Sequence, residues 1–391
     1  MIQQIVLSKN NLFFYFLLFG YIFGVVLYDF LKFDYTDELM AFFLVLFAGV
    51  TIWERKNIRE LYPLMIVISI FLFYTAYSFL IVSNTPQAIL KDFVIQIKPF
   101  IGFFCAWLLA PIFTKQQKQI ICISCLIIGG VILIATLTGN TWTFFGHPSR
   151  LATSATVTAL LFLYCCSFTW NDILIFIMLL SIGVLSTRSK FYGFFGVATF
   201  LIIYIKIGGE LKFNLKGLLF FFMLICVAIT LSWKKIVIYY LDGAMSSEQM
   251  WSRPAMMLTS LQILLDYFPL GCGLASFGTF ASAEYYSKTY EEYGISHLYG
   301  LTKDHPAFIT DAYYPELAQF GIIGVILYFT FWIWIIKIGT KKRYQNSKLF
   351  SFTLLVFLFF LIEGVADATF THNRGLFTLI LLGAFLSKDE K

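Results

Sequence analysis

Residues 61–82 read LYPLMIVISIFLFYTAYSFLIV, a run of 22 positions without a charged side chain. An α-helix needs about 20 apolar residues to cross a bilayer core, whereas a strand of a membrane barrel needs about 10 of alternating polarity. The run is apolar throughout, so it predicts a transmembrane helix. Similar runs recur along the chain. We expect spanning helices at residues 11–32, 37–53, 61–82, 91–113, 120–138, 151–169, 172–187, 191–206, 216–232, 313–336, 349–370 and 375–387.

The composition of the whole chain agrees with these runs. Of its 391 residues, 59% are hydrophobic and 13% are charged, whereas a soluble globular domain carries about 25% charge. The mean hydropathy is +0.81. Lipid leaves helices and closed barrels as the structures that satisfy every backbone hydrogen bond. The sequence therefore predicts an all-α polytopic integral membrane protein, in which residues 1–391 form a single domain of about twelve transmembrane helices.

The basic side chains gather in the loops of one face, which the positive-inside rule makes cytoplasmic. The even number of spans then leaves both termini in the cytoplasm. The net charge of +6 follows from this topology signal rather than from a basic stripe, which argues against a nucleic-acid partner. Sixteen of the 28 lysines and arginines lie on this face: Lys9, Arg55, Lys56, Arg59, Lys115, Lys118, Lys206, Lys212, Lys216, Lys337, Lys341, Lys342, Arg343, Lys348, Lys388 and Lys391.

Residues 233–312 form the only long hydrophilic connection, and the same topology puts this loop outside the cytoplasm. A loop of such length in a compact protein is usually functional. The connection 186–190 joins two runs that are short for full spans, so we expect it to dip into the outer leaflet.

Cysteine placement argues against metal or redox chemistry. Six of the seven cysteines lie inside apolar runs, and Cys272 alone lies in the long loop, which therefore has no internal disulfide. Cys122 and Cys125 form a C-x-x-C pattern on a lipid-embedded helix, without a second pair of ligands. We expect these two side chains to serve packing, and we expect no metal and no cofactor.

Four arginines map to helix ends on the side that the positive-inside rule disfavours: Arg150, Arg188, Arg253 and Arg374. An arginine near the membrane surface is costly and usually faces a cavity or a partner. Each one alone could extend toward lipid headgroups. Four on the same face favour a shared anion site.

Local sequence supports Arg253 as an anion ligand. Ser252 can cap a helix, Pro254 suits its first turn, and the run 256–267 is amphipathic. Arg253 would then sit at a helix N-terminus, where free N–H groups favour an anion and guanidinium adds bidentate recognition of phosphate. The same helix could instead lie on the membrane as an interfacial lid.

Candidate bases lie near the end of the long loop. Asp311 precedes the tenth expected span, where its carboxylate could cap the helix or accept a proton from a sugar hydroxyl. His305 is a rival base with an ordinary pKa suited to that task. His297 is a weaker candidate.

A second polar group belongs to the last two spans. Glu363 and Asp367 stand four residues apart and would share one helix face. His372 and Arg374 follow in the next loop. Carboxylates within the membrane mark functional cavities, so these residues could line an acceptor site. The alternative is a structural ion pair with Lys98 or with a neighbouring arginine. Lys98 lies on a helix that we expect the next residue, a proline, to kink.

Several of these residues occur in a familiar order. Arg253, residues 269–273 (PLGCG), 277–280 (FGTF) and 311–324 (DAYYPELAQFGIIG) resemble the O-antigen polymerase and ligase superfamily (Wzy/WaaL-like). Residues 186–188 (STR) at the start of one span, and Arg150 before another, add to the likeness. The resemblance covers roughly residues 140–340.

This resemblance implies a GT-C-like glycosyltransferase that works on undecaprenyl-diphosphate-linked oligosaccharides outside a bacterial inner membrane. Arg188, Arg253 and Arg150 would hold the lipid diphosphate. Ligases of the superfamily carry a histidine–asparagine pair where this chain has Asp311 and Ala312, so the likeness favours polysaccharide repeat polymerases. A chain-length regulator is the protein partner that it implies.

We therefore expect metal-independent, inverting polymerisation of lipid-linked repeat units, as in O-antigen, capsule or exopolysaccharide synthesis. One alternative is a ligase that moves a finished glycan to lipid A core or to a protein. Another is a twelve-helix flippase or transporter, although we find no two similar halves in the sequence. A structural partner in an envelope complex is a third.

Overall fold

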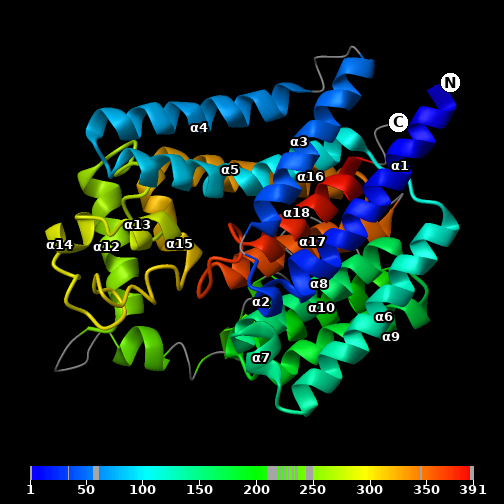
Figure 1. Ribbon diagram of the computed structural model, residues 1–391. Coiled ribbons are helices and arrows are strands. Elements are labelled where there is room, and N and C mark those ends of the chain that lie inside the picture. Colours follow the sequence, from blue (N-terminus) through cyan, green and yellow to red (C-terminus); the bar gives the residue numbers. More distant parts are fainter. Residues whose placement is uncertain are drawn as a thin grey trace.

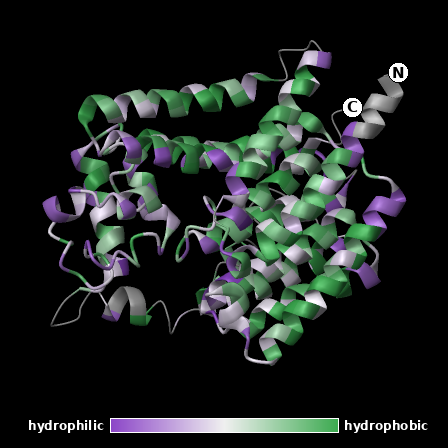
Figure 2. Ribbon diagram, viewed as in Figure 1, coloured by the Kyte–Doolittle hydropathy of each residue, from purple (hydrophilic) through white to green (hydrophobic). Residues whose placement is uncertain are grey.

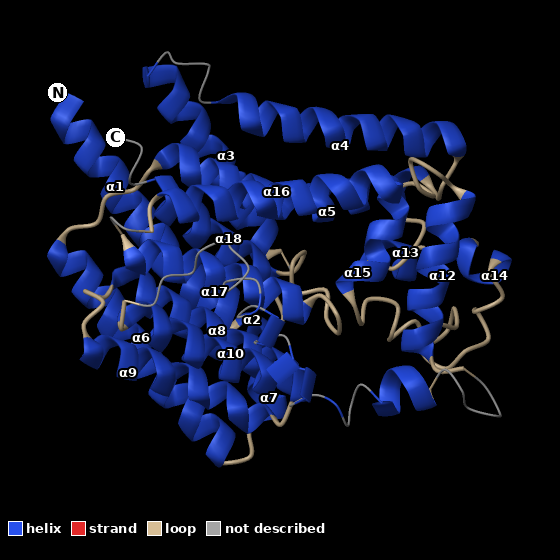
Figure 3. Cartoon of the chain, turned by 180° about the vertical axis from the view of Figure 1, so that it is seen from behind, coloured by secondary structure: helices blue, strands red, loops and turns tan. Residues whose placement is uncertain are grey.

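The computed structural model describes residues 2–33, 35–55, 61–208, 237–243, 250–343 and 346–387, with scattered positions between 219 and 233. These residues are helical or lie in turns and loops, and no strand occurs among them, as Figure 3 shows. Figure 2 shows that hydrophobic residues dominate the long helices. The expected all-helical class is confirmed.

Seven helical stretches of the described residues are long and apolar enough to cross a membrane. Two shorter apolar helices, 170–186 and 373–386, accompany them. The elements are α1 (Ile2–Phe19), η1 (Gly20–Val26), α2 (Tyr28–Leu31), α3 (Thr36–Arg55), α4 (Tyr62–Ile81), α5 (Pro86–Leu109), α6 (Lys115–Leu137), α7 (Thr141–Phe145), α8 (Pro148–Cys165), α9 (Trp170–Ser181), η3 (Ile182–Ser186), α10 (Ser189–Lys206), η4 (Val237–Asp242), α12 (Ser252–Asp266), α13 (Phe280–Glu284), α14 (Thr289–Glu292), α15 (Tyr313–Glu316), η5 (Leu317–Phe320), α16 (Gly321–Lys341), α17 (Ser347–Glu363) and α18 (Asn373–Leu386).

A described helix overlaps each of the expected spans except 216–232, most of which lies outside the described residues. The expected span 349–370 is wrong at its end, because α17 stops at Glu363. The Gly364 carbonyl there accepts hydrogen bonds from the Tyr313 amide (2.9 Å) and the Tyr314 amide (3.3 Å). These bonds from another segment fix the chain where it leaves the helix.

Helix α8 lies at the centre of a bundle and contacts α6, α9 and α18. Every residue from Leu151 to Cys165 is buried, and small side chains such as alanine, serine and threonine let the neighbouring helices approach closely. At its C-terminal end, Lys348 Nζ donates to the carbonyls of Tyr164 (2.9 Å) and Cys166 (2.5 Å). A cation at this end satisfies carbonyls that have no partner within the helix.

Figure 1 shows α12 to α15 set apart from the bundle, with α4, α5 and α16 extending between the two regions. The segment has an apolar core of its own, which contains Ala255, Met256, Ile263, Phe277, Tyr290, Leu301 and Ile309. The described part of the expected long loop from residue 250 onward is therefore folded.

Two glycines attach this segment to α16. Gly271 has a φ of +83°, and a Cβ on it would lie 2.2 Å from the Gly321 nitrogen. Tyr77 Oη on α4 donates to the Gly271 carbonyl at 2.9 Å. Only glycine allows both this φ and this close contact.

Candidate functional site

Charged side chains meet where α2, α8, α10 and α18 begin or end. Asp29 of α2 joins two of the predicted arginines, with Oδ1 2.6 Å from Arg150 Nη1 and Oδ2 2.6 Å from Arg374 Nη2. The Asp29 and Arg374 side chains are 3% and 5% exposed, while Arg150 is 48% exposed. Arg374 also donates to Ser154 Oγ at 2.7 Å. Two of the expected anion ligands thus share one buried carboxylate.

Arg188 has a different kind of partner. It is the residue before α10, directly after Thr187, whose φ of +56° is unusual for a side chain branched at Cβ. Its Nη2 lies 2.9 Å from Nε2 of His147, the residue before α8. No carboxylate of the described residues forms an ion pair with Arg188. A half-buried guanidinium beside a neutral ring keeps its charge available for an external anion.

The protonation state of His147 follows from this contact. Guanidinium only donates hydrogen bonds, so Nε2 must be the acceptor and the ring must be neutral. The Ser149 amide lies 3.3 Å from Nδ1 and would need the opposite tautomer, so we favour the shorter, charge-assisted bond to Arg188. Burial, and then the charge of Arg188, lower the pKa of His147 from its ordinary value.

Arg253 and Asp311 form an ion pair. Arg253 Nε and Nη2 lie 2.7 Å and 2.6 Å from Asp311 Oδ2, and the two side chains are 26% and 31% exposed. Arg253 is the second residue of α12, so its expected place at a helix N-terminus is confirmed. The expected helix caps, Ser252 and Asp311, are wrong. The N-cap position is held by Trp251 in α12 and by Ala312 in α15. Ser252 instead donates to the Tyr299 carbonyl, and Asp311 turns to Arg253.

Two carboxylates act electrostatically on the Arg188–His147 pair. The charges of Asp367 and Asp311 both raise the pKa of His147, opposing the effect of burial. Interactions of this kind fall off with distance, so both carboxylates lie near the Arg188–His147 pair. The expected arginines thus fall into three contacts, Arg150 and Arg374 on Asp29, Arg188 on His147 and Arg253 on Asp311, and the charge of Asp311 reaches His147.

Lys190, a residue that the sequence argument passed over, organises the second polar group. Its Nζ lies 2.7 Å from Glu363 Oε2 and 3.1 Å from Asp367 Oδ2. Thr369 Oγ1 lies within 3.3 Å of both carboxylates. The expected shared helix face is wrong, because α17 ends at Glu363 and Asp367 lies just beyond the turn that follows it. Lys190 and Thr369 bring the two acids together instead.

Lys98 is not the partner of these acids, as one alternative had it. Buried in α5, it pairs with Asp37 and with Glu38 (2.7 Å) in the first turn of α3. Helix α5 continues through Pro99 to Leu109.

His372 precedes α18 and borders the same region. Desolvation by the surrounding protein lowers the pKa of His372. The charge of Asp367 raises this pKa, and the charge of Arg150 lowers it further. The residue is nevertheless exposed to solvent, so the surrounding protein desolvates the side chain only in part.

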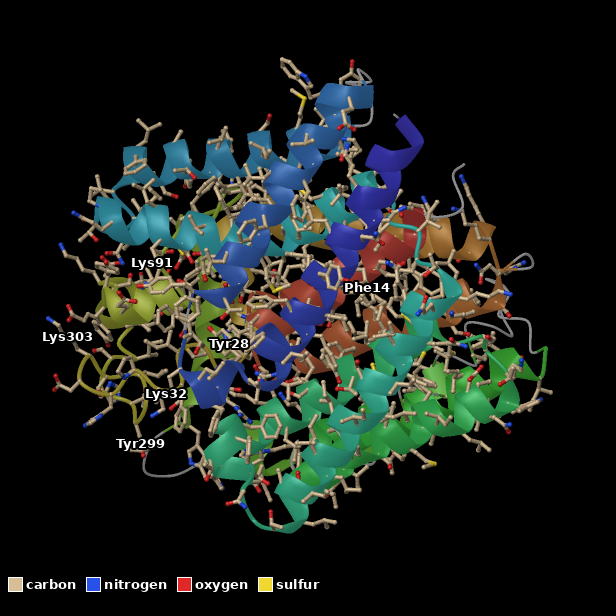
Figure 4. All side chains as sticks on the ribbon, turned by 45° about the vertical axis from the view of Figure 1, so that its right-hand side comes forward. Phe14, Tyr28, Lys32, Lys91, Tyr299 and Lys303 are labelled. Atoms are coloured by element: carbon tan, nitrogen blue, oxygen red, sulfur yellow. The ribbon has the colours of Figure 1, made fainter. Side chains whose placement is uncertain are left out.

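The other histidines of the loop lie elsewhere. His305 and His297 are exposed, and no side chain of the described residues hydrogen bonds to either ring. In Figure 4, Lys303, two residues before His305, lies at the edge of the molecule and points away from it. Among the described residues, no hydrogen bond joins either ring to an arginine.

We compared the chain with known proteins. No protein-family model matches it, and no curated protein matches it. Its chemistry must therefore be argued from the site itself. The site offers an arginine without a carboxylate partner in the described part of the chain, a neutral histidine beside it and a partly exposed carboxylate nearby. Such a set can bind an oxyanion and accept a proton.

Proposed function

We propose that this protein is a membrane glycosyltransferase that polymerises polysaccharide repeat units carried on undecaprenyl diphosphate. The observation that carries the proposal is Arg188, whose described partner is the neutral His147 at 2.9 Å. An arginine without a carboxylate partner among the described residues suits an anionic substrate group. The likeness of residues 186–188 and 311–324 to the polymerase and ligase superfamily supports this choice of substrate.

A diphosphate fits guanidinium chemistry well. Arginine binds two phosphate oxygens at once, and each charge-assisted hydrogen bond contributes about 1.5–3 kcal/mol. The diphosphate is also the leaving group, so Arg188 would stabilise negative charge that grows in the transition state. Arg150, half exposed beside Asp29, can supply a further contact at the rim.

Asp311 is the base that we favour. Both contacts from Arg253 end on Oδ2, which leaves Oδ1 to accept a proton. In the proposed step, a hydroxyl oxygen of one lipid-linked repeat attacks the anomeric carbon of the growing chain. The carbon–oxygen bond to the diphosphate breaks, its electron pair stays on the diphosphate, and the hydroxyl proton passes to Oδ1. The configuration at the anomeric carbon is inverted.

The proposal includes a membrane arrangement. Twelve helices of a GT-C-like protein would span the bacterial plasma membrane, with both termini cytoplasmic and the arginines outside. The distribution of basic residues in the sequence supports this orientation. A polysaccharide chain-length regulator would be the partner, and polymerisation would need no metal.

The test is deletion of the gene in its native host, with the surface glycan resolved by gel. Complementation uses wild type, Arg188→Ala, Arg188→Lys and Asp311→Asn, and membrane expression is checked for each. We expect Arg188→Ala to lower polymer formation by about 10²–10⁴-fold, because two charge-assisted bonds are lost. Lysine keeps the charge without the bidentate geometry and should restore part of the activity.

The control is Lys303→Ala, which removes an exposed cation of the same loop and should complement fully. A null strain whose lipid A core carries a single repeat unit supports the polymerase. Polymer that accumulates on the lipid carrier would mean a ligase instead. Full activity of every Arg188 and Asp311 variant would refute the site.

A further inference from the structure

Helix α12 turns leucines outward, and the proposed glycosyl transfer uses none of them. Leu258, Leu261 and Leu265 are 46%, 58% and 77% exposed. Their spacing of three and four residues puts them on one face of the helix. Phe268, three residues beyond Leu265, is 70% exposed. We call these four residues the apolar stripe of α12. An exposed apolar surface of this kind marks a site of contact with a protein or a membrane.

The opposite face of α12 packs against the protein. Met256 and Ile263 belong to the apolar core of the segment from α12 to α15. Thr259 and Ser260 are buried too. The hydroxyl groups of α12 therefore turn inward while its leucines turn outward, which is the reverse of a surface helix in water. This polarity is the one expected of a helix whose outer face borders hydrocarbon.

The apolar stripe continues onto helices that can cross the membrane. Leu270, two residues after Phe268, lines a groove of about 620 Å³ together with residues of α4 and α16. Phe73 of α4 and Ile323 of α16 are among the walls of this groove. Both helices are long and apolar enough to span a bilayer. Lipid that fills the groove therefore meets the C-terminal end of the stripe.

The direction of α12 suits a membrane surface. Figures 1 and 3 show α12 crossing the direction of α4 and α16, beside the end of α4 that leads into α5. A helix that crosses spanning helices lies along the plane of the bilayer, as interfacial helices do. Trp251, directly before α12, is 44% exposed, and Tyr267, directly after it, is 36% exposed. Tryptophan and tyrosine are enriched at membrane–water interfaces, so one such ring at each end of α12 fits the same depth.

We propose that the apolar stripe of α12 inserts into the lipid bilayer, with Leu258, Leu261 and Leu265 among the acyl chains. The segment from α12 to α15 would then be anchored to the membrane along this helix, in addition to its attachment to α16. The inference does not rest on the proposed function, because insertion is measured without substrate. If both hold, the bilayer would keep Arg253, at the N-terminus of α12, at the depth where a lipid diphosphate lies.

The experiment measures the surroundings of nitroxide spin labels on the full chain in vesicles of phosphatidylethanolamine and phosphatidylglycerol. Cys226→Ser is the background, because Cys226 is exposed, and single cysteines are added as Leu261→Cys and Leu265→Cys. Power saturation compares collisions with oxygen, which concentrates in hydrocarbon, and with a neutral nickel chelate, which stays in water. We expect nickel collisions at both positions to be at least about fivefold rarer than at a water-exposed position, because a polar complex enters hydrocarbon at a cost.

Two matched variants set the limits of the scale. Leu72→Cys, at a position 55% exposed on α4, reports lipid. Lys303→Cys reports water, since Lys303 points away from the molecule in Figure 4. All four labelled variants should melt within about 2 °C of the background in detergent, because exposed side chains contribute little packing.

Labels at positions 261 and 265 that behave like the label at position 72 support the proposal. Labels that behave like the one at position 303 would overturn it, since the stripe would then face water. Protection from both oxygen and nickel would overturn it as well, because protein would then cover the stripe. Spin–spin broadening that disappears on mixing with unlabelled chain would identify that protein as a second copy.

Discussion

Asp29 offers the most direct test of how the arginines are held. In Asp29→Asn the shape is kept and the charge is lost, which leaves Arg374 with 5% of its side chain exposed and no carboxylate at the 2.6 Å position. Breaking a buried ion pair by removing one partner costs about 3–5 kcal/mol. Arg150 is 48% exposed, so water can replace its share of the bridge. Arg150→Gln should therefore cost about 1 kcal/mol or less.

The assay is thermal unfolding of purified protein in one detergent, followed by circular dichroism. Asp29→Asn should lower the melting temperature by at least about 5 °C, and Arg150→Gln by about 2 °C or less. The double variant Asp29→Asn/Arg374→Gln should cost clearly less than the sum of its single changes, because it removes both buried charges. Equal losses for Arg150→Gln and Asp29→Asn would refute the reasoning.

Five further variants probe other positions by the same melting assay. The pKa of His147 is lowered in the folded state. The contribution of His147 to stability is therefore full above about pH 6.5 and is lost as the pH falls below that value. His147→Gln should remove this part of the pH dependence of the melting temperature, and an unchanged pH profile would contradict the argument. Gly271→Ala should prevent folding or lower stability by about 2–4 kcal/mol, whereas Gly139→Ala, with a φ of +77° and open space around it, should cost about 1 kcal/mol. Lys190→Gln should destabilise by about 3 kcal/mol, since two buried carboxylates lose their cation, and Lys190→Arg should restore part of the loss.

The helices could be predicted from the sequence because apolar runs of spanning length leave few alternatives in lipid. Their ends were less readable. The i, i+4 spacing of Glu363 and Asp367 suggested one helix face, but α17 ends at Glu363. That end depends on bonds from the Tyr313 and Tyr314 amides, about fifty residues away in sequence.

The arginines of the site were also predictable, because topology alone assigns helix ends to one face. Their partners were not. Asp29 lies 121 and 345 positions from the two arginines that it joins, and His147 lies 41 positions from Arg188. Such pairings follow from how the helices pack, which no local pattern specifies. Pro148 was the one local signal that could have pointed to His147, since a proline in the first turn marks a helix start.

The hydroxyl-rich centre of the bundle bears on how this protein is made. Helix α8 carries five serines and threonines between Ser149 and Thr158, and it is not among the described helices that are long and apolar enough to cross a membrane. If such a helix left the translocon by itself, it would partition poorly into lipid. It would be retained until neighbours such as α6 and α18 shield it. Because α18 follows α8 in the chain and packs against it, the centre of the bundle closes only after α18 has been made.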